Sequence, residues 1–278
     1  MQEILNEQSA SNRIQSASLD AVLNGGKRLR PFLVVESAKL FGLTDPRVLR
    51  AAAALECVHC YSLVHDDLPS MDDDDMRRGQ PTIHKKYDEA TAILAGDGLL
   101  TLAFEILANT KTGKDANVRV ELISALAKAC GMNGMVGGQM LDLQAEAMSM
   151  ELTQSDVEQL QDLKTGRLIQ VAVEMGAVMG SADTKEKKAL HTYATKIGLA
   201  FQIADDLLDS LGDMEKTGKA VGKDENKNKA TFVRLLGIDG AKEYAGELIA
   251  EAKQALEIFG EKGKTLSLLA DFIIDRDV

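Results

Sequence analysis

The chain of 278 residues has no tryptophan, only three cysteines and only four prolines. All four prolines lie within the first 81 residues. Because proline lacks the backbone N–H that a helix needs, no residue after position 81 interrupts a helix in this way. Three cysteines are too few for a disulfide-stabilised scaffold. No apolar run approaches the roughly 20 residues of a membrane span, and the polar first twelve residues lack a signal-peptide core. We therefore expect a cytoplasmic protein without an integral membrane segment.

Positive charge is also in deficit, since 32 lysines and arginines face 43 aspartates and glutamates, for a net charge of −11. A general nucleic-acid-binding surface needs the opposite balance, so we expect no nucleic-acid partner. One local basic site for an anion remains compatible with this total. Hydrophobic residues at 45% and charged residues at 27% are ordinary for a globular protein that buries a large core.

The remaining composition favours an all-α fold, because Ala, Leu, Glu, Lys and Met dominate the proline-free part. Asp45-Pro46 has the pattern of an N-cap followed by proline at the first helical position. Ser155 with Glu158 has the spacing of a capping box. We predict one domain over residues 1–278, with helices near 30–41, 46–67, 87–110, 117–147, 155–180, 185–211, 240–259 and 264–275.

Six aspartates lie within ten positions, from Asp66 to Asp75, at the end of the predicted helix 46–67. Positions 48, 52, 55, 59, 62 and 66 share one helical face, and this stripe changes from apolar to polar as it approaches Asp66. Such a stripe indicates a carboxylate that points into a cavity. Pro69 should end the helix and turn Asp72 back toward Asp66.

Carboxylates this close repel one another and raise one another's pKa unless a cation lies between them. Oxygen-only ligands favour Mg²⁺, which completes its shell with water and substrate phosphate. A solvated acidic loop is the simpler alternative for this segment taken alone.

A second acidic cluster follows in the predicted helix 185–211, where Gly198, Gln202, Asp205 and Asp209 share a face. Acids within an apolar helix are costly to bury without a counter-ion, so two such clusters suggest facing metal sites. Basic residues suited to phosphate accompany both clusters. They occur in Gly25-Gly26-Lys27-Arg28-Leu29-Arg30, Arg77-Arg78-Gly79 and Lys164-Thr165-Gly166-Arg167, and at Lys219 and Lys229.

Five segments therefore occur in order: 25–31, Asp66-Asp67 through Asp72, Arg77-Arg78-Gly79, Lys164-Thr165-Gly166, and Phe201-Gln202 through Asp209. With them the chain resembles the trans-polyprenyl diphosphate synthases, from residue 25 to about residue 237. The resemblance implies antiparallel helices around a deep cavity, a homodimer, and three Mg²⁺ ions. It implies metal ligands at Asp66, Asp72 and Asp205, supported by Asp67, Asp206 and Asp209. Only 24 residues precede Gly25, where relatives usually carry a longer helical segment.

The same resemblance implies that isopentenyl diphosphate is joined to dimethylallyl or geranyl diphosphate, with diphosphate released. The isopentenyl site would use Lys27, Arg30, His59 and Arg78, and the allylic site Arg77, Lys164, Thr165, Gln202, Lys219 and Lys229. Tyr61, five positions before Asp66 and beside Ser62, resembles the floor of sites that form the fifteen-carbon farnesyl product. Tyr61 as an ordinary core aromatic is the alternative, and a geranylgeranyl or other chain length stays open.

The sequence gives less support to three other interpretations. Cys57-x-x-Cys60 near His59 and His65 suggests zinc or a redox pair, but no second cysteine pair accompanies it. A terpene cyclase would use one aspartate-rich motif and no isopentenyl site. A non-catalytic subunit of a heteromeric synthase would be expected to lose aspartates, and this chain has both sets.

Overall fold

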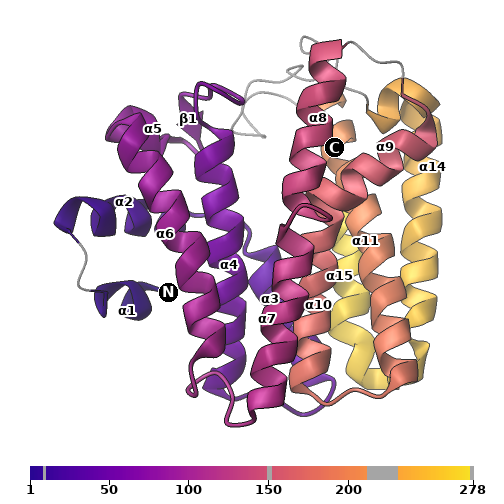
Figure 1. Cartoon of the computed structure of the whole chain (residues 1–278). Coiled ribbons are helices and arrows are strands. Elements are labelled where there is room, and N and C mark those ends of the chain that lie inside the picture. Colours follow the sequence, from indigo (N-terminus) through magenta and orange to yellow (C-terminus); the bar gives the residue numbers. More distant parts are fainter. Residues whose placement is uncertain (9–10, 149–151, 212–230, 276–278) are drawn as a thin grey trace. The chain divides into compact units, whose positions relative to one another are not determined.

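The computed structural model describes residues 1–8, 11–148, 152–211 and 231–275 (Figure 1). The described residues are almost entirely helical, which confirms the all-α prediction. The only strands among them form a short antiparallel hairpin of β1 (Met76–Arg77) and β2 (Gln80–Pro81). The chain divides into two compact units. The first unit contains Met1–Phe32 and Asp45–Ile123, and the second contains Leu33–Thr44 and Ser124–Val278.

The first unit is built around α4 (Pro46–Asp66) and α6 (Glu89–Ala108), which lie side by side. Asp45 begins α4 as predicted, because its carboxylate accepts a hydrogen bond from the backbone N–H of Arg47. Its other helices are α1 (Gln2–Asn6), α2 (Asn12–Leu23), the start of α3 (Leu29–Lys39), α5 (Ile83–Lys86) and the start of α7 (Ala116–Cys130).

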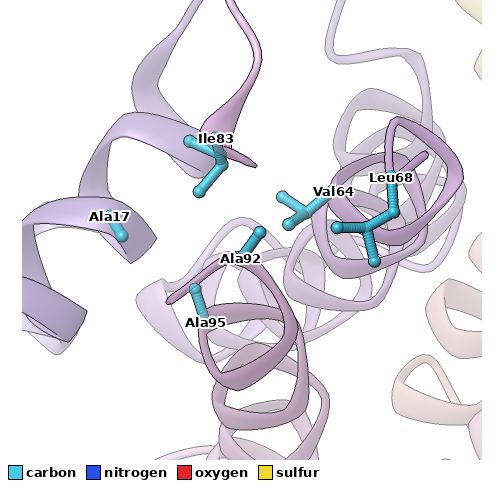
Figure 2. Close-up of a cluster of buried hydrophobic side chains, with 6 residues drawn as sticks. All are labelled: Ala17, Val64, Leu68, Ile83, Ala92 and Ala95. Atoms are coloured by element: carbon cyan, nitrogen blue, oxygen red, sulfur yellow. The ribbon is translucent and has the colours of Figure 1, made fainter. Parts of the chain in front are cut away.

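A small apolar cluster joins four of these helices close to the end of α4 (Figure 2). Val64 and Leu68 extend from α4 and the residues after it toward Ala92 and Ala95 of α6. Ala17 of α2 and Ile83 of α5 complete the cluster. Small residues on α6 permit close approach, since a Cβ at Gly96 would lie 2.1 Å from Nε2 of His65. This packing fixes the end of α4, where the first acidic cluster begins.

The helix α6 is long and apolar enough to cross a membrane by length and composition alone. Its sequence nevertheless carries Glu89, Asp97 and Glu105, and nine of its residues are buried. Those residues pack against α4 and other elements of the first unit. The core helix of a folded protein passes the same test, so α6 gives only weak support for a membrane segment.

The second unit is dominated by α11 (Thr184–Leu211) and α14 (Phe232–Ala255), which lie side by side. The buried hydroxyl of Tyr193 on α11 donates to the carbonyl of Leu266, 2.8 Å away, in α15 (Lys264–Ile274). The other elements are the end of α3, the end of α7, α8 (Met135–Met148), α9 (Gln154–Gln161), a π-helix (Asp162–Gly166), α10 (Arg167–Met179) and a 3₁₀ helix (Glu257–Gly263).

Several predicted boundaries are wrong, and glycine accounts for two of them. The helix predicted over 117–147 is two helices, because a turn closed by Gly131 and Gly134 separates α7 from α8. The helix predicted over 240–259 begins earlier, at Phe232, and contains a kink at Gly237, which has a φ of 71°. Glycine adopts this left-handed conformation without the steric cost that other residues meet.

The helix predicted over 155–180 divides into α9, the π-helix and α10. Its capping box is formed by Thr153 and Asp156, which exchange hydrogen bonds, and the predicted pair Ser155 and Glu158 is wrong. Glu158 instead accepts a hydrogen bond of 2.9 Å from the hydroxyl of Tyr244. The hairpin and the helices α1, α2 and α5 were not predicted.

We expect Gly176→Ala to destabilise the protein by about 1–3 kcal/mol, because an overpacked core must shift. A Cβ at Gly176 of α10 would lie 2.6 Å from Cβ of Ser37 and 2.7 Å from the backbone N of Ala38. Gly246→Ala is the matched control in α14, where a new Cβ would meet nothing within 4 Å. Alanine there should stabilise by about 0.5–1 kcal/mol. Urea unfolding measures both, and equal effects would contradict the packing argument.

Candidate active site

The polar end of α4 carries the first group of predicted site residues. Val48, Ala52 and Leu55 are at most 3% exposed, whereas His59, Ser62 and Asp66 further along the same face are partly exposed. The apolar start of this face is therefore buried and its polar end partly exposed, while the cavity into which Asp66 is predicted to point stays a prediction. Because α4 ends at Asp66, that carboxylate lies at the accessible end of a well-buried helix.

The chain reverses immediately after α4, as Pro69 predicted. The backbone N–H of Asp72 donates to the carbonyl of Asp66 over 2.9 Å, and that of Asp73 donates to Leu68 over 3.1 Å. Asp73 takes a left-handed φ of 51°, which closes the turn. Asp66 and Asp72 are thus joined through their backbones, and two carboxylates from one turn fit the donor set that Mg²⁺ uses beside substrate phosphate.

Asp67 has a different environment from Asp66. It is 3% exposed, and its Oδ1 lies 2.5 Å from Nη2 of Arg77 and 2.6 Å from Nε. Burial raises the pKa of Asp67, and the hydrogen bond from Arg77 opposes that rise. Arg77 also lies 3.7 Å from Asp74. This buried pair ties the end of α4 to the hairpin, while the predicted roles of Asp67 at metal and of Arg77 at the allylic diphosphate remain predictions.

Basic residues gather in the first unit where the 25–30 turn meets the 77–79 turn. Nη1 of Arg78 donates to the carbonyl of Gly25 over 3.0 Å. Burial and the charges of Arg30 and Arg78 hold the pKa of His59 well below its usual value, so His59 is neutral at neutral pH. Lys27 is exposed and Arg30 partly exposed. The predicted isopentenyl diphosphate residues therefore share one positively charged region of the first unit.

Tyr61 is 6% exposed, and its ring meets the edge of His65 with centroids 5.7 Å apart. The hydroxyl of Ser62 donates to the carbonyl of His59 over 2.9 Å, within α4 itself. Both predicted chain-length residues therefore lie within a turn and a half of Asp66 on the same helix. Their role in product length stays a prediction.

The second acidic cluster repeats the division seen in the first. Asp205, Asp209 and Gln202 on α11 are partly exposed, whereas Asp206 is 6% exposed. A carboxylate oxygen of Asp206 accepts a hydrogen bond of 2.8 Å from the backbone N–H of Phe232, the first residue of α14. Asp206 therefore joins α11 to the start of α14. Its predicted place among the catalytic aspartates is untested.

Lys164 and Thr165 lie in the π-helix, a rare form that often marks functional sites. Nζ of Lys164 lies 2.5 Å from Oδ2 of Asp142 on α8. A Cβ at Gly138 would lie 2.3 Å from the backbone N of Lys164, so glycine allows α8 to approach the widened turn. Asp142 was not predicted, although an acid one turn after Gly138 in a largely apolar helix was an available signal.

Lys219 and Lys229 lie outside the described residues. The first acidic cluster belongs to the first unit and the second to the second unit, and their approach across one cavity stays a prediction. Within the described residues, no group of three His, Cys, Asp or Glu side chains could hold a metal ion.

The cysteines give no support to the zinc or redox interpretation. Cys57, Cys60 and Cys130 are all buried free thiols. Burial raises the pKa of Cys60 to about 12, which keeps the thiol protonated at neutral pH. Metal binding and thiol exchange both require the thiolate.

Comparison with known proteins gives a consistent result. The Polyprenyl synthetase family model matches residues 12–273. The chain is 48% identical to farnesyl diphosphate synthase of Escherichia coli over 262 residues, which cover 92% of this chain and 86% of that protein. Its fold is similar to an apo structure of an FPP/GFPP synthase from Zymomonas mobilis, with a TM-score of 0.89, 44% identity, and coverage of 98% and 92%. It is also similar to a geranyltransferase of Helicobacter pylori complexed with magnesium and isoprenyl diphosphate, with a TM-score of 0.84, 34% identity, and coverage of 99% and 92%.

We expect Asp67→Asn to lower the free energy of unfolding by about 1.5–3 kcal/mol, because it removes the charged hydrogen-bond partner of the largely buried Arg77 and leaves only Asp74, 3.7 Å away. Asp75→Asn is the control in the same loop, where the pair with Lys85 is exposed and its loss should cost at most about 1 kcal/mol. Urea denaturation of both variants tests this. Equal stability of Asp67→Asn and the parent protein would show that the pair does not stabilise the fold.

Proposed function

The chain belongs to the polyprenyl synthetase family, and we propose that it joins isopentenyl diphosphate to dimethylallyl or geranyl diphosphate and makes mainly farnesyl diphosphate. The main observation behind this proposal is that the chain is 48% identical to a farnesyl diphosphate synthase over nearly its whole length. The accessible aspartates of α4 and α11 and the basic region of the first unit support the same chemistry. This function makes the chain a head-to-tail prenyltransferase of the all-α isoprenoid synthase fold.

The cofactor in this proposal is Mg²⁺, three ions for each active site. Asp66 and Asp72 would hold it from the first unit, and Asp205 from the second, with Asp67 and Asp209 as the further predicted ligands. When bound, Mg²⁺ neutralises the charge of the allylic diphosphate and makes it a better leaving group. The similar Helicobacter pylori geranyltransferase, whose structure is complexed with magnesium and isoprenyl diphosphate, supports the choice of metal.

The residues of this chain would prepare the reaction by binding and orienting two diphosphates. Lys164, Thr165, Gln202 and Arg77 would bind the allylic diphosphate, with Lys219 and Lys229 from outside the described residues. Positive charge placed there before the reaction favours rupture of the allylic carbon–oxygen bond, since the departing diphosphate gains negative charge.

Lys27, Arg30, Arg78 and the neutral His59 would hold isopentenyl diphosphate so that its double bond reaches the allylic carbon. The double-bond electrons form the new carbon–carbon bond, and a proton then leaves the adjacent carbon for the released diphosphate. No side-chain base is needed for that step. An apolar lining of the site would keep out water, which would otherwise capture the carbocation.

Product length is the finer part of the proposal. The growing chain would extend along α4 until it meets Tyr61, with Ser62 beside it. A buried ring held against His65 can act as a rigid floor. Longer products are the second candidate, because the similar Zymomonas mobilis protein is an FPP/GFPP synthase.

The proposal also includes the assembly and location of the protein: a homodimer in the cytoplasm, without nucleic-acid partners.

The direct test incubates the purified chain with Mg²⁺, isopentenyl diphosphate and each allylic primer, followed by chromatography of the dephosphorylated products. We expect mainly the fifteen-carbon alcohol. Release of diphosphate from an allylic substrate alone would instead indicate a terpene cyclase. Failure to release diphosphate with both substrates would indicate a non-catalytic subunit.

We expect Asp66→Ala and Asp205→Ala each to lower turnover by about a thousandfold or more, because each removes a metal ligand from charge-stabilised ionisation. Both side chains are partly exposed, so unfolding midpoints should change little. Circular dichroism in urea provides that control. A normal rate in either variant would remove that residue from the metal site.

Tyr61→Ala should lengthen the product, because removal of the ring opens space below the growing chain. Chromatography should show a shift from fifteen to twenty or more carbons at an overall rate within about tenfold of the parent. Phe in place of Tyr61 is the control, since it keeps the ring and should keep the product. An unchanged product in Tyr61→Ala would make Tyr61 an ordinary core residue.

A further inference from the structure

The turn that carries Lys27 and Arg30 has an unusual backbone. Gly25, Gly26 and Arg28 have φ values of 75°, 97° and 51°, all in the left-handed region. Glycine adopts this conformation freely, but Arg28 does so only at a steric cost that its surroundings must offset. The conformation of Arg28 therefore decides how the chain leaves the turn and where its two neighbouring cations lie.

Two contacts hold Arg28 in place. Its Nη1 forms an ion pair with Oε1 of Glu56, and its Nη2 donates to the carbonyl of Val22 at the end of α2 over 2.5 Å. Glu56 is 3% exposed and lies one helical turn before His59 on α4. A buried carboxylate on a rigid helix is a fixed anchor, and the planar guanidinium can bind it and the carbonyl at once.

The other side of the turn is held by Arg78. Its guanidinium donates to the carbonyl of Gly25 and occupies the space of a side chain at Gly26, where a Cβ would lie 2.5 Å from Cζ. The turn is thus clamped between α4 and the 77–79 turn. Among these charged groups, Glu56 is the buried acid that opposes the cations, so its charge alone would repel a diphosphate.

We propose that Glu56 is a positioning residue for isopentenyl diphosphate, which acts through Arg28 to fix Lys27 and Arg30. This inference rests on the proposed function and adds residues that do not themselves contact substrate. Positioning and simple charge predict opposite effects of Glu56→Gln. Loss of positioning weakens binding of isopentenyl diphosphate, whereas removal of a nearby negative charge strengthens it.

The experiment measures steady-state kinetics of the full chain with Mg²⁺, and calorimetric binding of isopentenyl diphosphate, for five variants. For Glu56→Gln we expect the KM for isopentenyl diphosphate to rise about tenfold, with kcat and the KM for geranyl diphosphate within about twofold. Arg28→Gln should show the same split. In the double variant the two effects should not multiply, because both remove one contact.

Glu36→Gln is the matched control, since Glu36 is likewise a buried acid, 9% exposed, but pairs with Lys39 over 2.6 Å and not with Arg28. It should leave the KM values unchanged. Arg28→Lys, with a partly exposed side chain, provides a milder second variant should Glu56→Gln not fold, and its KM for isopentenyl diphosphate should also rise.

Four outcomes overturn the inference: an unchanged KM for isopentenyl diphosphate in Glu56→Gln, a lowered one, a parallel rise in both KM values, or fully multiplicative effects in the double variant. Failure of the parent protein to join the two substrates would instead overturn the proposed function. In that case, calorimetry of isopentenyl diphosphate with the same variants still decides the role of Glu56: weaker binding supports it and unchanged or tighter binding overturns it.

Discussion

Repulsion among the crowded aspartates after α4 is the constraint on which the first unit depends. The structure relieves it by placing cations beside three of the carboxylates. Asp67 and Asp74 face Arg77, and Asp75 pairs with Lys85 at 2.8 Å. The backbone hydrogen bond from the N–H of Asp72 to the carbonyl of Asp66 then holds the reversed chain in place. A segment that would repel itself as a free loop becomes an ordered turn because cations from the adjoining hairpin and α5 contact it.

The two acidic clusters solve the same problem in the same way. In each, one aspartate of an adjacent pair is buried and bonded to another element, Asp67 to Arg77 and Asp206 to the backbone of Phe232. The other aspartate of each pair, Asp66 or Asp205, is partly exposed. A pair of neighbours on a helix points in directions about 100° apart, so one can stabilise the fold while the other faces the site.

Much of this could be predicted from sequence, because local periodicity determines it. The stripe on α4 predicted which residues would be buried, and Pro69 predicted the reversal that brings Asp72 back to Asp66. The roles within each aspartate pair could not be predicted, because they depend on Arg77 and Phe232, which only the tertiary fold brings into contact. The break at 131–134 and the π-helix were missed for a related reason: glycine and a helix-forming composition are compatible with both straight and interrupted helices.

The π-helix at Asp162–Gly166 links the length of the chain to the direction of Lys164. A π-turn accommodates one residue more than an α-turn does. Loss of a single residue between α9 and α10 would let an unbroken α-helix form, and the residues of the widened turn would then take new directions about the helix axis. Lys164 and Asp142 would then no longer meet as they do now. Insertions and deletions in this stretch are thus constrained by the direction that each side chain takes about the helix axis, even where the altered sequence would readily form a helix.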